Sequence, residues 1–300
     1  MRIEMKTITV LAAMLIGAAA AAADRPVPAG VIPGGLAKSK CRFLPALAGT
    51  SLQKLDADRS IALMKAADVK FVGVSVFQLP LNSSGDQVSA YRKRLEDAGV
   101  RPVSYGPVEF DSEADARKAF AVAKGLGAGV LVGIPFERRA DAKEGEDFRK
   151  ESDAMIDVAE KLAKEFDIRF AIPNLGPDPA RVYQWADHVW RKVEKRDARM
   201  GLCLDVGEEF RGGRGPSWTI HSFRTRIFCV KFRNVTEPSS NGFDVPLSSG
   251  VGDLVEVVRK LAEVGYDGPV EADCRRGIDD PACPVVEACS YIRGAADSVR

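Results

Sequence analysis

The stretch that decides the fold is residues 148–172, which read FRKESDAMIDVAEKLAKEFDIRFAI. Over residues 148–166 the apolar side chains recur at every third or fourth position, which predicts a helix with one buried face. Residues 168–172 are mostly apolar, as are residues 130–134 upstream, and both runs have the length and composition of a buried strand. A strand, a helix and a second strand in this order are typical of parallel βα units.

The same alternation continues along most of the chain. We expect eight strands, at residues 41–44, 71–76, 100–105, 130–134, 168–172, 202–206, 227–232 and 269–273. Two of the intervening helices begin with capping pairs, Ser112 with Asp115 and Asp253 with Glu256. Eight such units close into a barrel, and residues 41–300 match the roughly 250 residues typical of that architecture. The predicted fold class is therefore α/β, a single-domain (β/α)8 TIM barrel. An open doubly wound sheet is the alternative, but no Gly-x-Gly-x-x-Gly follows the first strand.

The amino terminus has the pattern of an export signal. Arg2 and Lys6 precede an apolar run at residues 7–16, and alanines fill residues 18–23. We expect residues 1–23 to be a signal peptide that is cleaved after Ala23, and residues 24–40 to be a linker. The apolar run is shorter than the roughly 20 residues that a membrane-spanning helix needs. The prediction is an exported protein, periplasmic or extracellular, with no stable membrane anchor after cleavage.

The charge balance narrows the class of binding partner, and the cysteine content limits the number of disulfides. The 300 residues carry a formal net charge of +1, and without residues 1–23 they carry 41 basic and 41 acidic side chains. This balance argues against a nucleic-acid partner, which clustered Lys and Arg would bind, and favours a small molecule. The six cysteines are too few for a disulfide scaffold. Cys274 and Cys283 are the best candidates for a disulfide.

Charged side chains gather where the predicted strands end, which is where function collects in such barrels. The alternation of a strand puts Asp205 at the end of the sixth strand and Lys231 and Arg233 on one face of the seventh. Glu271 and Asp273 share a face of the eighth strand. The alternative is that each of these residues makes only a structural ion pair at the rim.

Further polar residues are candidates for binding a substrate. Asn174 follows the fifth strand, and Glu208 lies three residues after Asp205. Tyr105 and Gln78 lie near the ends of the third and second strands and are candidate partners for sugar hydroxyls. Together with Arg233, these residues form the predicted substrate-binding set.

Five segments then carry a resemblance to a known family: VRPVSYG at 100–106, AIPNLG at 171–176, LDVGE at 204–208, VKFRNV at 230–235 and GYDGPVEAD at 265–273. In this order they resemble the sugar phosphate isomerase/epimerase group of the xylose isomerase-like TIM barrels. The resemblance covers nearly all of residues 41–291.

The resemblance implies a divalent metal, Mn or Mg, held at the barrel mouth by two Glu, one Asp and one His. Such a metal orients a sugar's oxygens while carboxylates move a proton between adjacent carbons. Position by position, the family's Asp is Asp205 and its last Glu is the shorter Asp273, which makes these two the metal-ligand candidates. The fifth-strand ligand falls at Pro173, the seventh-strand His at Lys231, and the second-strand Glu that serves as a base at Gly73.

Other positions depart from the family as well. Glu208 stands where the family usually has His, and Arg233 and Asn234 stand where it has Lys and Asp. The two histidines, His188 and His221, fall in predicted helices outside the barrel, so they do not supply the missing ligands.

A charge count suggests a replacement for the metal. The family's four ligands and a divalent ion sum to −1, and so do Asp205, Asp273 and Lys231 without a metal. The hypothesis is that the Lys231 ammonium takes the electrostatic role of the ion and bridges the two carboxylates.

Two functions remain open. The first is an isomerase or epimerase acting on a sugar or polyol, with Asp205 and Asp273 as acid and base and Lys231 as electrophile. The second is a non-catalytic carbohydrate-binding or scaffold protein that has kept the fold and lost the metal site. Activity depends on the site and not on the barrel, so the fold cannot choose between them.

Overall fold

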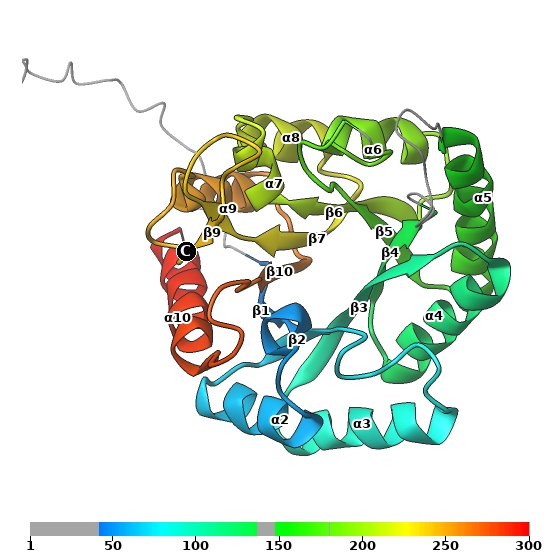
Figure 1. Cartoon of the computed structure of the whole chain (residues 1–300), viewed down its shortest axis with the longest axis horizontal. Helices are drawn as coiled ribbons and strands as arrows, with labels where there is room; N and C mark the ends of the chain where they lie inside the picture. The colour runs from blue at the N-terminus through cyan, green and yellow to red at the C-terminus, as the bar shows by residue number, and fades with distance from the viewer. Residues whose placement is uncertain (1–41, 137–147, 180, 300) are drawn as a thin grey trace, which may run out of the picture. The chain divides into compact units, whose positions relative to one another are not determined.

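The computed structural model describes residues 42–136, 148–179 and 181–299. Eight parallel strands form one closed barrel in the order β1-β10-β7-β6-β5-β4-β3-β2. Figure 1 shows the helices arranged around this barrel, so the predicted (β/α)8 TIM barrel is confirmed. The strands are β1 Leu44–Ala48, β2 Phe71–Val74, β3 Arg101–Phe110, β4 Val130–Pro135, β5 Arg169–Pro173, β6 Met200–Asp205, β7 Ile227–Phe232 and β10 Pro269–Ala272, with a short antiparallel pair, β8 Asn234–Val235 and β9 Asp244–Val245, after β7.

Two of the helices begin where the sequence places their caps. The side chain of Ser112 accepts from the amide of Asp115, and that of Asp253 accepts from the amide of Glu256. The predicted helix at 148–166 is α5, with Phe148 as its N-cap residue. The helices are η1 Gly49–Leu52 (3-10), α2 Ala57–Ala66, α3 Gly85–Asp97, α4 Glu113–Leu126, α5 Arg149–Phe166, α6 Ala186–Val193, α7 Val206–Arg211, α8 Pro216–Phe223, α9 Leu254–Glu263 and α10 Ala282–Ser298.

The strand boundaries differ most for the first strand. We predicted it at residues 41–44, but β1 runs from Leu44 to Ala48 and pairs with β10 through Leu47. Pro45 resembles a strand end because proline lacks the amide hydrogen of a ladder bond. Here the pairing nevertheless continues through Pro45, which lies opposite Val270. The chain therefore reaches the barrel mouth at Ala48 and not near residue 44.

Two apolar clusters stabilise the barrel. The larger one lies between the strands and the surrounding helices. The smaller one is separate and fills part of the barrel interior with side chains from β4 to β7. Its members are Val130, Val132, Ala171, Cys203, Phe228 and Cys229. Charged side chains occupy the interior nearer the carboxyl ends of the strands, so the fold places the polar groups at the expected end of the barrel.

The amino-terminal predictions fall outside the described residues. The expected signal peptide at 1–23 and linker at 24–40 lie there, as do Cys41 and Arg300 at the limits of the predicted barrel. Among the described residues, no helix combines the length and the apolar character needed to cross a bilayer.

Candidate functional site

A buried ion pair lies inside the barrel below the mouth. Lys231 on β7 and Glu271 on β10 are register partners, and the Lys231 Nζ donates to a Glu271 carboxylate oxygen. The Ser104 hydroxyl donates to the same carboxylate over 2.5 Å, and the Cys229 thiol donates over 3.2 Å. Burial by itself would lower the pKa of Lys231, but Glu271 and its neighbours raise it above its ordinary value. Lys231 is therefore a protonated amine held by one carboxylate.

This pairing corrects the expected bridge between Lys231 and the two aspartates. Lys231 forms its ion pair with Glu271, whereas Asp205 and Asp273 pair with arginines. The reason is the register of the barrel: Glu271 lies directly opposite Lys231, and Asp273 lies two residues further toward the mouth. The prediction had the right cation but the wrong carboxylates.

A glycine on β2, which is separated from β10 by β1, makes room for Glu271. A Cβ atom added at Gly73 would lie 2.6 Å from the Cδ of Glu271, closer than real Cβ atoms approach other atoms. Gly73 stands on the second strand at the position where the family resemblance implies a Glu that serves as a base. The carboxylate of β10 therefore occupies the space that a side chain of β2 would need.

Arg233 organises the charges at the mouth. Its Nε lies 3.0 Å from Asp205 Oδ1, its Nη2 lies 3.0 Å from Asp205 Oδ2, and its Nη1 lies 3.0 Å from Asp244 Oδ1. The Nη2 also donates to Glu208, which accepts from Arg211 over 2.6 Å. We call Arg233, Asp205, Glu208 and Asp244 the Arg233 cluster. All three nitrogens of the guanidinium are occupied by carboxylates.

The Arg233 cluster is shielded from water and perturbs its own carboxyl groups. Arg233 is only 1% exposed, and Asp205 is 4% exposed. Burial raises the pKa of Asp205, partly opposed by Arg233. Burial acts in the same direction on Glu208, but Arg233 and Arg211 prevail and lower its pKa. The pKa values of Asp205 and Glu208 are therefore shifted in opposite directions within one cluster.

Asp273 lies beside this cluster at the end of β10. It accepts from the Thr50 hydroxyl over 2.7 Å and from the Arg275 Nε over 3.1 Å. Arg275 also lies 3.8 Å from Asp205, so one guanidinium faces both aspartates. Burial alone would raise the pKa of Asp273, but Arg275, Lys231 and Arg233 hold it well below its ordinary value. Asp273 is therefore ionised at neutral pH.

Acid is expected to destabilise the fold partly through Asp273. Its folded-state pKa lies below the unfolded value of about 3.8, so its stabilising contribution is complete above that pH and is lost as the pH falls further. Urea unfolding at pH 7, 4 and 3 measures this loss. Asp273→Asn should flatten the pH dependence below pH 4, and Asp86→Asn on the exposed side of α3 should not. An unchanged slope in Asp273→Asn would contradict the assignment.

The structure brings together only part of the predicted substrate-binding set. Asn174 accepts from the Asp205 amide over 2.7 Å and donates to the Asp205 carbonyl over 3.0 Å, so it fixes the backbone where β6 ends. Gln78 instead connects two loops, by donating to the Gly49 carbonyl and accepting from Ser75. Tyr105 is fully buried in the larger apolar cluster and donates to the Leu79 carbonyl.

The placement of Tyr105 follows from the alternation of β3. Ser104 points inward to Glu271, so its neighbour Tyr105 points to the helix layer. The expectation that Tyr105 contacts a sugar is therefore not met in this structure. Glu208 and Arg233, in contrast, lie together with Asp205 in the Arg233 cluster.

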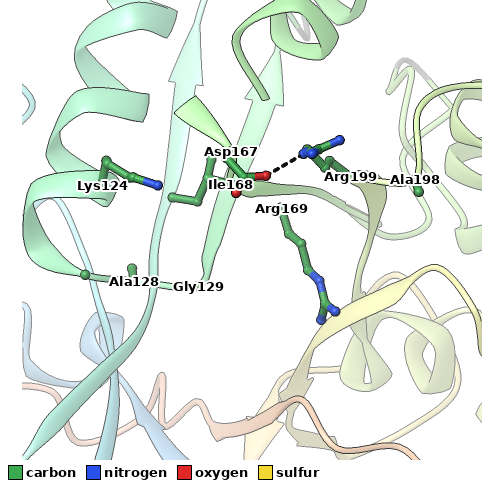
Figure 2. Close-up of a pocket in the computed structure, with 9 residues that line it drawn as sticks. Lys124, Ala128, Gly129, Asp167, Ile168, Arg169, Ala198 and Arg199 are labelled. Atoms are coloured by element: carbon green, nitrogen blue, oxygen red, sulfur yellow. Dashed lines mark hydrogen bonds and ion pairs between the residues drawn. The ribbon is translucent and has the colours of Figure 1, made fainter. Parts of the chain in front are cut away.

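Two cavities are relevant to ligand binding. One of about 390 Å³ lies beside the end of β10, and we call it the β10 cavity. A larger one of about 630 Å³ lies at the amino ends of β4, β5 and β6, where Arg199 pairs with Asp167 (Figure 2). The larger cavity is at the end of the barrel opposite the charged groups. The β10 cavity includes Asp273, so we take it as the candidate ligand site.

The β10 cavity combines charged and apolar walls. Asp244, Asp273, Arg275 and Arg276 supply charge, and Glu287 of α10 lies nearby. The remaining lining residues are Val245, Pro246, Leu247, Cys274, Gly277, Cys283, Pro284 and Ala288.

The expected disulfide between Cys274 and Cys283 is absent. Both are free thiols in the structure. The Cys274 thiol points to the Pro284 carbonyl at 3.5 Å, whereas Cys283 is exposed at the start of α10. The turn at Gly277 brings the two segments together around the cavity, but it does not bring the thiols into a bond.

The divalent metal implied by the resemblance lacks fitting ligands. Within the described ranges, no three His, Cys, Asp or Glu side chains are arranged to hold a metal ion. Of the two candidate ligands, Asp205 is engaged by Arg233 and Asp273 by Arg275. His188 and His221 lie in α6 and α8, outside the barrel, as expected. With Arg233 and Arg275 in place, the donor set at the mouth fits these cationic side chains and not a metal.

Three residues of the site were not in the predicted catalytic and substrate-binding sets. Glu271 was noted on the eighth strand, and its pairing with Lys231 could have been predicted, because adjacent seventh and eighth strands place the two residues side by side. Asp244 lies on the short strand β9 in a loop, and Arg275 follows β10 by three residues. The sequence offers no periodicity in these loops that would place either side chain.

Comparison with known proteins agrees with the geometry. The family model described as xylose isomerase-like TIM barrel matches residues 61–295. The chain belongs to this family. A search of curated protein sequences finds no match for this xylose isomerase-like barrel.

Solved structures share the fold at low identity. A D-tagatose 3-epimerase-like protein is 12% identical, with 86% of this chain and 98% of that chain covered and a TM-score of 0.71. A xylose isomerase domain protein from Alicyclobacillus acidocaldarius subsp. acidocaldarius is 15% identical, with 86% and 99% covered and a TM-score of 0.70. An L-ribulose 3-epimerase is 15% identical, with 86% and 96% covered and a TM-score of 0.68. At such identities the likeness establishes the fold of this xylose isomerase-like barrel.

Proposed function

We propose that this xylose isomerase-like barrel binds a carbohydrate or polyol in the β10 cavity, without a divalent metal. The observation that carries the proposal is the composition of that cavity. Asp273 and Arg275 provide a hydrogen-bond acceptor and donor, and Val245, Leu247 and Pro284 provide apolar contact. A sugar ring offers both hydroxyls and C–H faces, and binding sites for small molecules combine such walls.

The accessible charge also suits this ligand. Arg275 is 42% exposed on its side chain, and it holds Asp273 in an ion pair at 3.1 Å. A hydroxyl can accept from the free N–H groups of the guanidinium and donate to the carboxylate. Two of the similar solved structures are named as sugar epimerases or epimerase-like proteins, which supports the choice of a sugar.

The interior of the barrel favours binding over sugar isomerisation. Gly73 stands at the position of a catalytic base, and its space is occupied by Glu271. Lys231 stays protonated inside its ion pair and is 4% exposed, so it is not placed to polarise a ligand in the β10 cavity. Asp205 is engaged by Arg233 through both of its oxygens.

A metal-independent proton transfer is the second candidate. It is favoured by the opposite pKa directions of two neighbouring carboxyls, since burial raises that of Asp205 while Arg275 and other cations lower that of Asp273. Environments that separate two such pKa values are typical of an acid and a base. In this reading Asp205 donates a proton and Asp273 accepts one next to a sugar carbonyl.

One pair of measurements separates the candidates. Thermal unfolding with a panel of sugars and polyols, in EDTA and in Mn²⁺, measures binding, and NMR in D2O measures exchange of the sugar C–H protons. Binding without exchange, equal in EDTA and Mn²⁺, is the expected result. Exchange that Asp205→Asn abolishes would favour the enzyme instead.

Two arginine variants test whether the ligand binds in the β10 cavity. Arg275→Gln is expected to weaken sugar binding about tenfold, which corresponds to the loss of one hydrogen bond to a charged group. Arg169→Gln is the matched control, because Arg169 lines the cavity at the opposite end of the barrel. Equal affinity of the Arg275→Gln variant and the unmodified protein would exclude the β10 cavity as the site.

We also propose that the protein is exported. The support is the sequence of residues 1–23, in which Arg2 and Lys6 precede an apolar run and a stretch of alanines. Amino-terminal sequencing of protein from the native host should begin at Asp24. A mature protein that retains residues 1–23 would contradict the proposal.

A further inference from the structure

We propose that the Arg233 guanidinium takes the place of a bound cation. It lies among the carboxylates of Asp205, Glu208 and Asp244, and we call the space between these three carboxylates the cradle. Once the guanidinium is removed, the cradle binds a hydrated divalent cation. The inference deepens the metal-independent part of the proposed function and rests on that part alone. Whether the β10 cavity takes a sugar does not enter it.

The contacts of Arg233 are those expected of a central ion. Its three nitrogens contact Asp205 from the end of β6, Glu208 from α7 and Asp244 from β9. These carboxylates come from three separate elements and converge on one side chain. Arg233 is 1% exposed, so the carboxylates and not water satisfy its charge.

The charge balance favours a cation at this place. Asp205, Glu208 and Asp244 bring three negative charges, and Arg233 and Arg211 bring two positive ones. Without Arg233, three carboxylates would face each other with Arg211 as the main compensation. Like charges at this distance repel in a poorly solvated site, so the vacated space favours a new cation.

Two glycines show that the chain is fitted to this arrangement. A Cβ atom at Gly207 would lie 2.8 Å from the Arg233 Cβ and 3.1 Å from its Nε. A Cβ atom at Gly176, where φ is +94°, would lie 2.9 Å from the Cδ of Glu208. Both glycines belong to motifs at the ends of β5 and β6. They allow the side chains of the Arg233 cluster to approach the backbone.

The chemistry of the replacing ion follows from the spacing. The carboxylates are arranged around a planar guanidinium and do not form a cage for a bare ion, in keeping with the absence of a three-ligand metal group in the described ranges. Mg²⁺ usually keeps several of its waters and binds through one or two carboxylates. A hydrated Mg²⁺ or Mn²⁺ therefore fits the cradle that the guanidinium leaves.

The test compares Mn²⁺ binding by the full chain and by Arg233→Ala, with free Mn²⁺ measured by electron paramagnetic resonance and stability by thermal unfolding. The unmodified protein should bind no Mn²⁺ at this site and unfold at the same temperature in EDTA and in Mn²⁺. Arg233→Ala should bind about one Mn²⁺ per chain, and saturating Mn²⁺ should raise its unfolding temperature by about 5 °C.

Two variants serve as controls. Arg233→Lys keeps a positive charge in the cradle and should bind no Mn²⁺. Arg211→Ala removes a cation that contacts Glu208 and Asp244 but leaves Arg233 in place, so it too should bind none.

Defined results would overturn the proposal. One is a tightly bound Mn²⁺ in the unmodified protein. Another is a folded Arg233→Ala variant that binds no Mn²⁺.

If Arg233→Ala does not fold, Arg233→Gln is measured in the same way, and both are refolded with and without Mn²⁺. Recovery that depends on Mn²⁺ supports the proposal, and recovery or failure that Mn²⁺ does not alter contradicts it. None of these results depends on sugar binding, so the two proposals can fail separately.

Discussion

Replacing Lys231 with Met is expected to lower the free energy of unfolding by about 3–5 kcal/mol, the loss typical when one partner of a buried ion pair is removed. Glu271 has no exposed surface. Without the ammonium, the donors left to it among the residues that the structure describes would be the Ser104 hydroxyl and the Cys229 thiol. An ionised carboxylate with so few partners is poorly stabilised in a dry interior. Urea unfolding monitored by circular dichroism measures the change.

A double variant separates the charge from the packing. Lys231→Met combined with Glu271→Gln removes both charges and leaves side chains of similar size, so it should regain at least about half of the lost stability. Exposed Lys93, which pairs with Asp97 on the surface of α3, is the matched control. Lys93→Met should change stability by less than about 1 kcal/mol. If the double variant lost as much free energy of unfolding as the two single variants together, Lys231 and Glu271 would not be a coupled pair.

The second large effect is expected at Gly73. Gly73→Ala should lower the free energy of unfolding by about 2–3 kcal/mol, because its Cβ would overlap the Glu271 carboxylate and that side chain is packed on all sides. Gly73→Glu should prevent folding, since it adds a second buried carboxylate beside the first. Expression yield and urea unfolding measure both changes.

Exchanging the residues at positions 73 and 271 tests whether the Glu271 carboxylate occupies the space beside Gly73. In Gly73→Glu combined with Glu271→Gly, the carboxylate moves from β10 to β2 and Lys231 keeps a partner in the same interior space. The double variant should fold and be more stable than Gly73→Glu alone. Gly85→Ala, where an added Cβ meets nothing within 4 Å, is the control and should be neutral or slightly stabilising. A double variant no better than Gly73→Glu would show that Glu271 does not occupy the space of a β2 side chain.

The elements of the barrel were predictable because each is decided locally. The helix of residues 149–166 and the strands of β4 and β7 follow from the spacing of apolar residues, and Ser112 and Asp253 cap helices through amides three residues away. The first strand was misplaced because its position depends on pairing with β10, more than two hundred residues away in the sequence.

The candidate site was predictable in its members and not in its contacts. Asp205, Glu208 and Arg233 were all expected at the mouth, and the structure joins them. Asp244 completes their cluster from a loop that has no periodic pattern to place it. Tyr105 was expected at the mouth because it ends a predicted strand, but β3 continues to Phe110 and turns this side chain outward.

The sequence by itself determined that this chain is an eight-stranded barrel and that cationic side chains stand on the seventh strand where the family resemblance expects a metal ligand. Only the tertiary structure decided which carboxylate each cation holds: Lys231 takes Glu271, and Arg233 takes Asp205, Glu208 and Asp244. The physical reason is that alternation along a strand decides which face of the sheet a side chain points to, whereas the register between strands decides how far along the barrel axis it lies. Electrostatic energy falls with distance, so the position along the axis decides which carboxylate each cation pairs with.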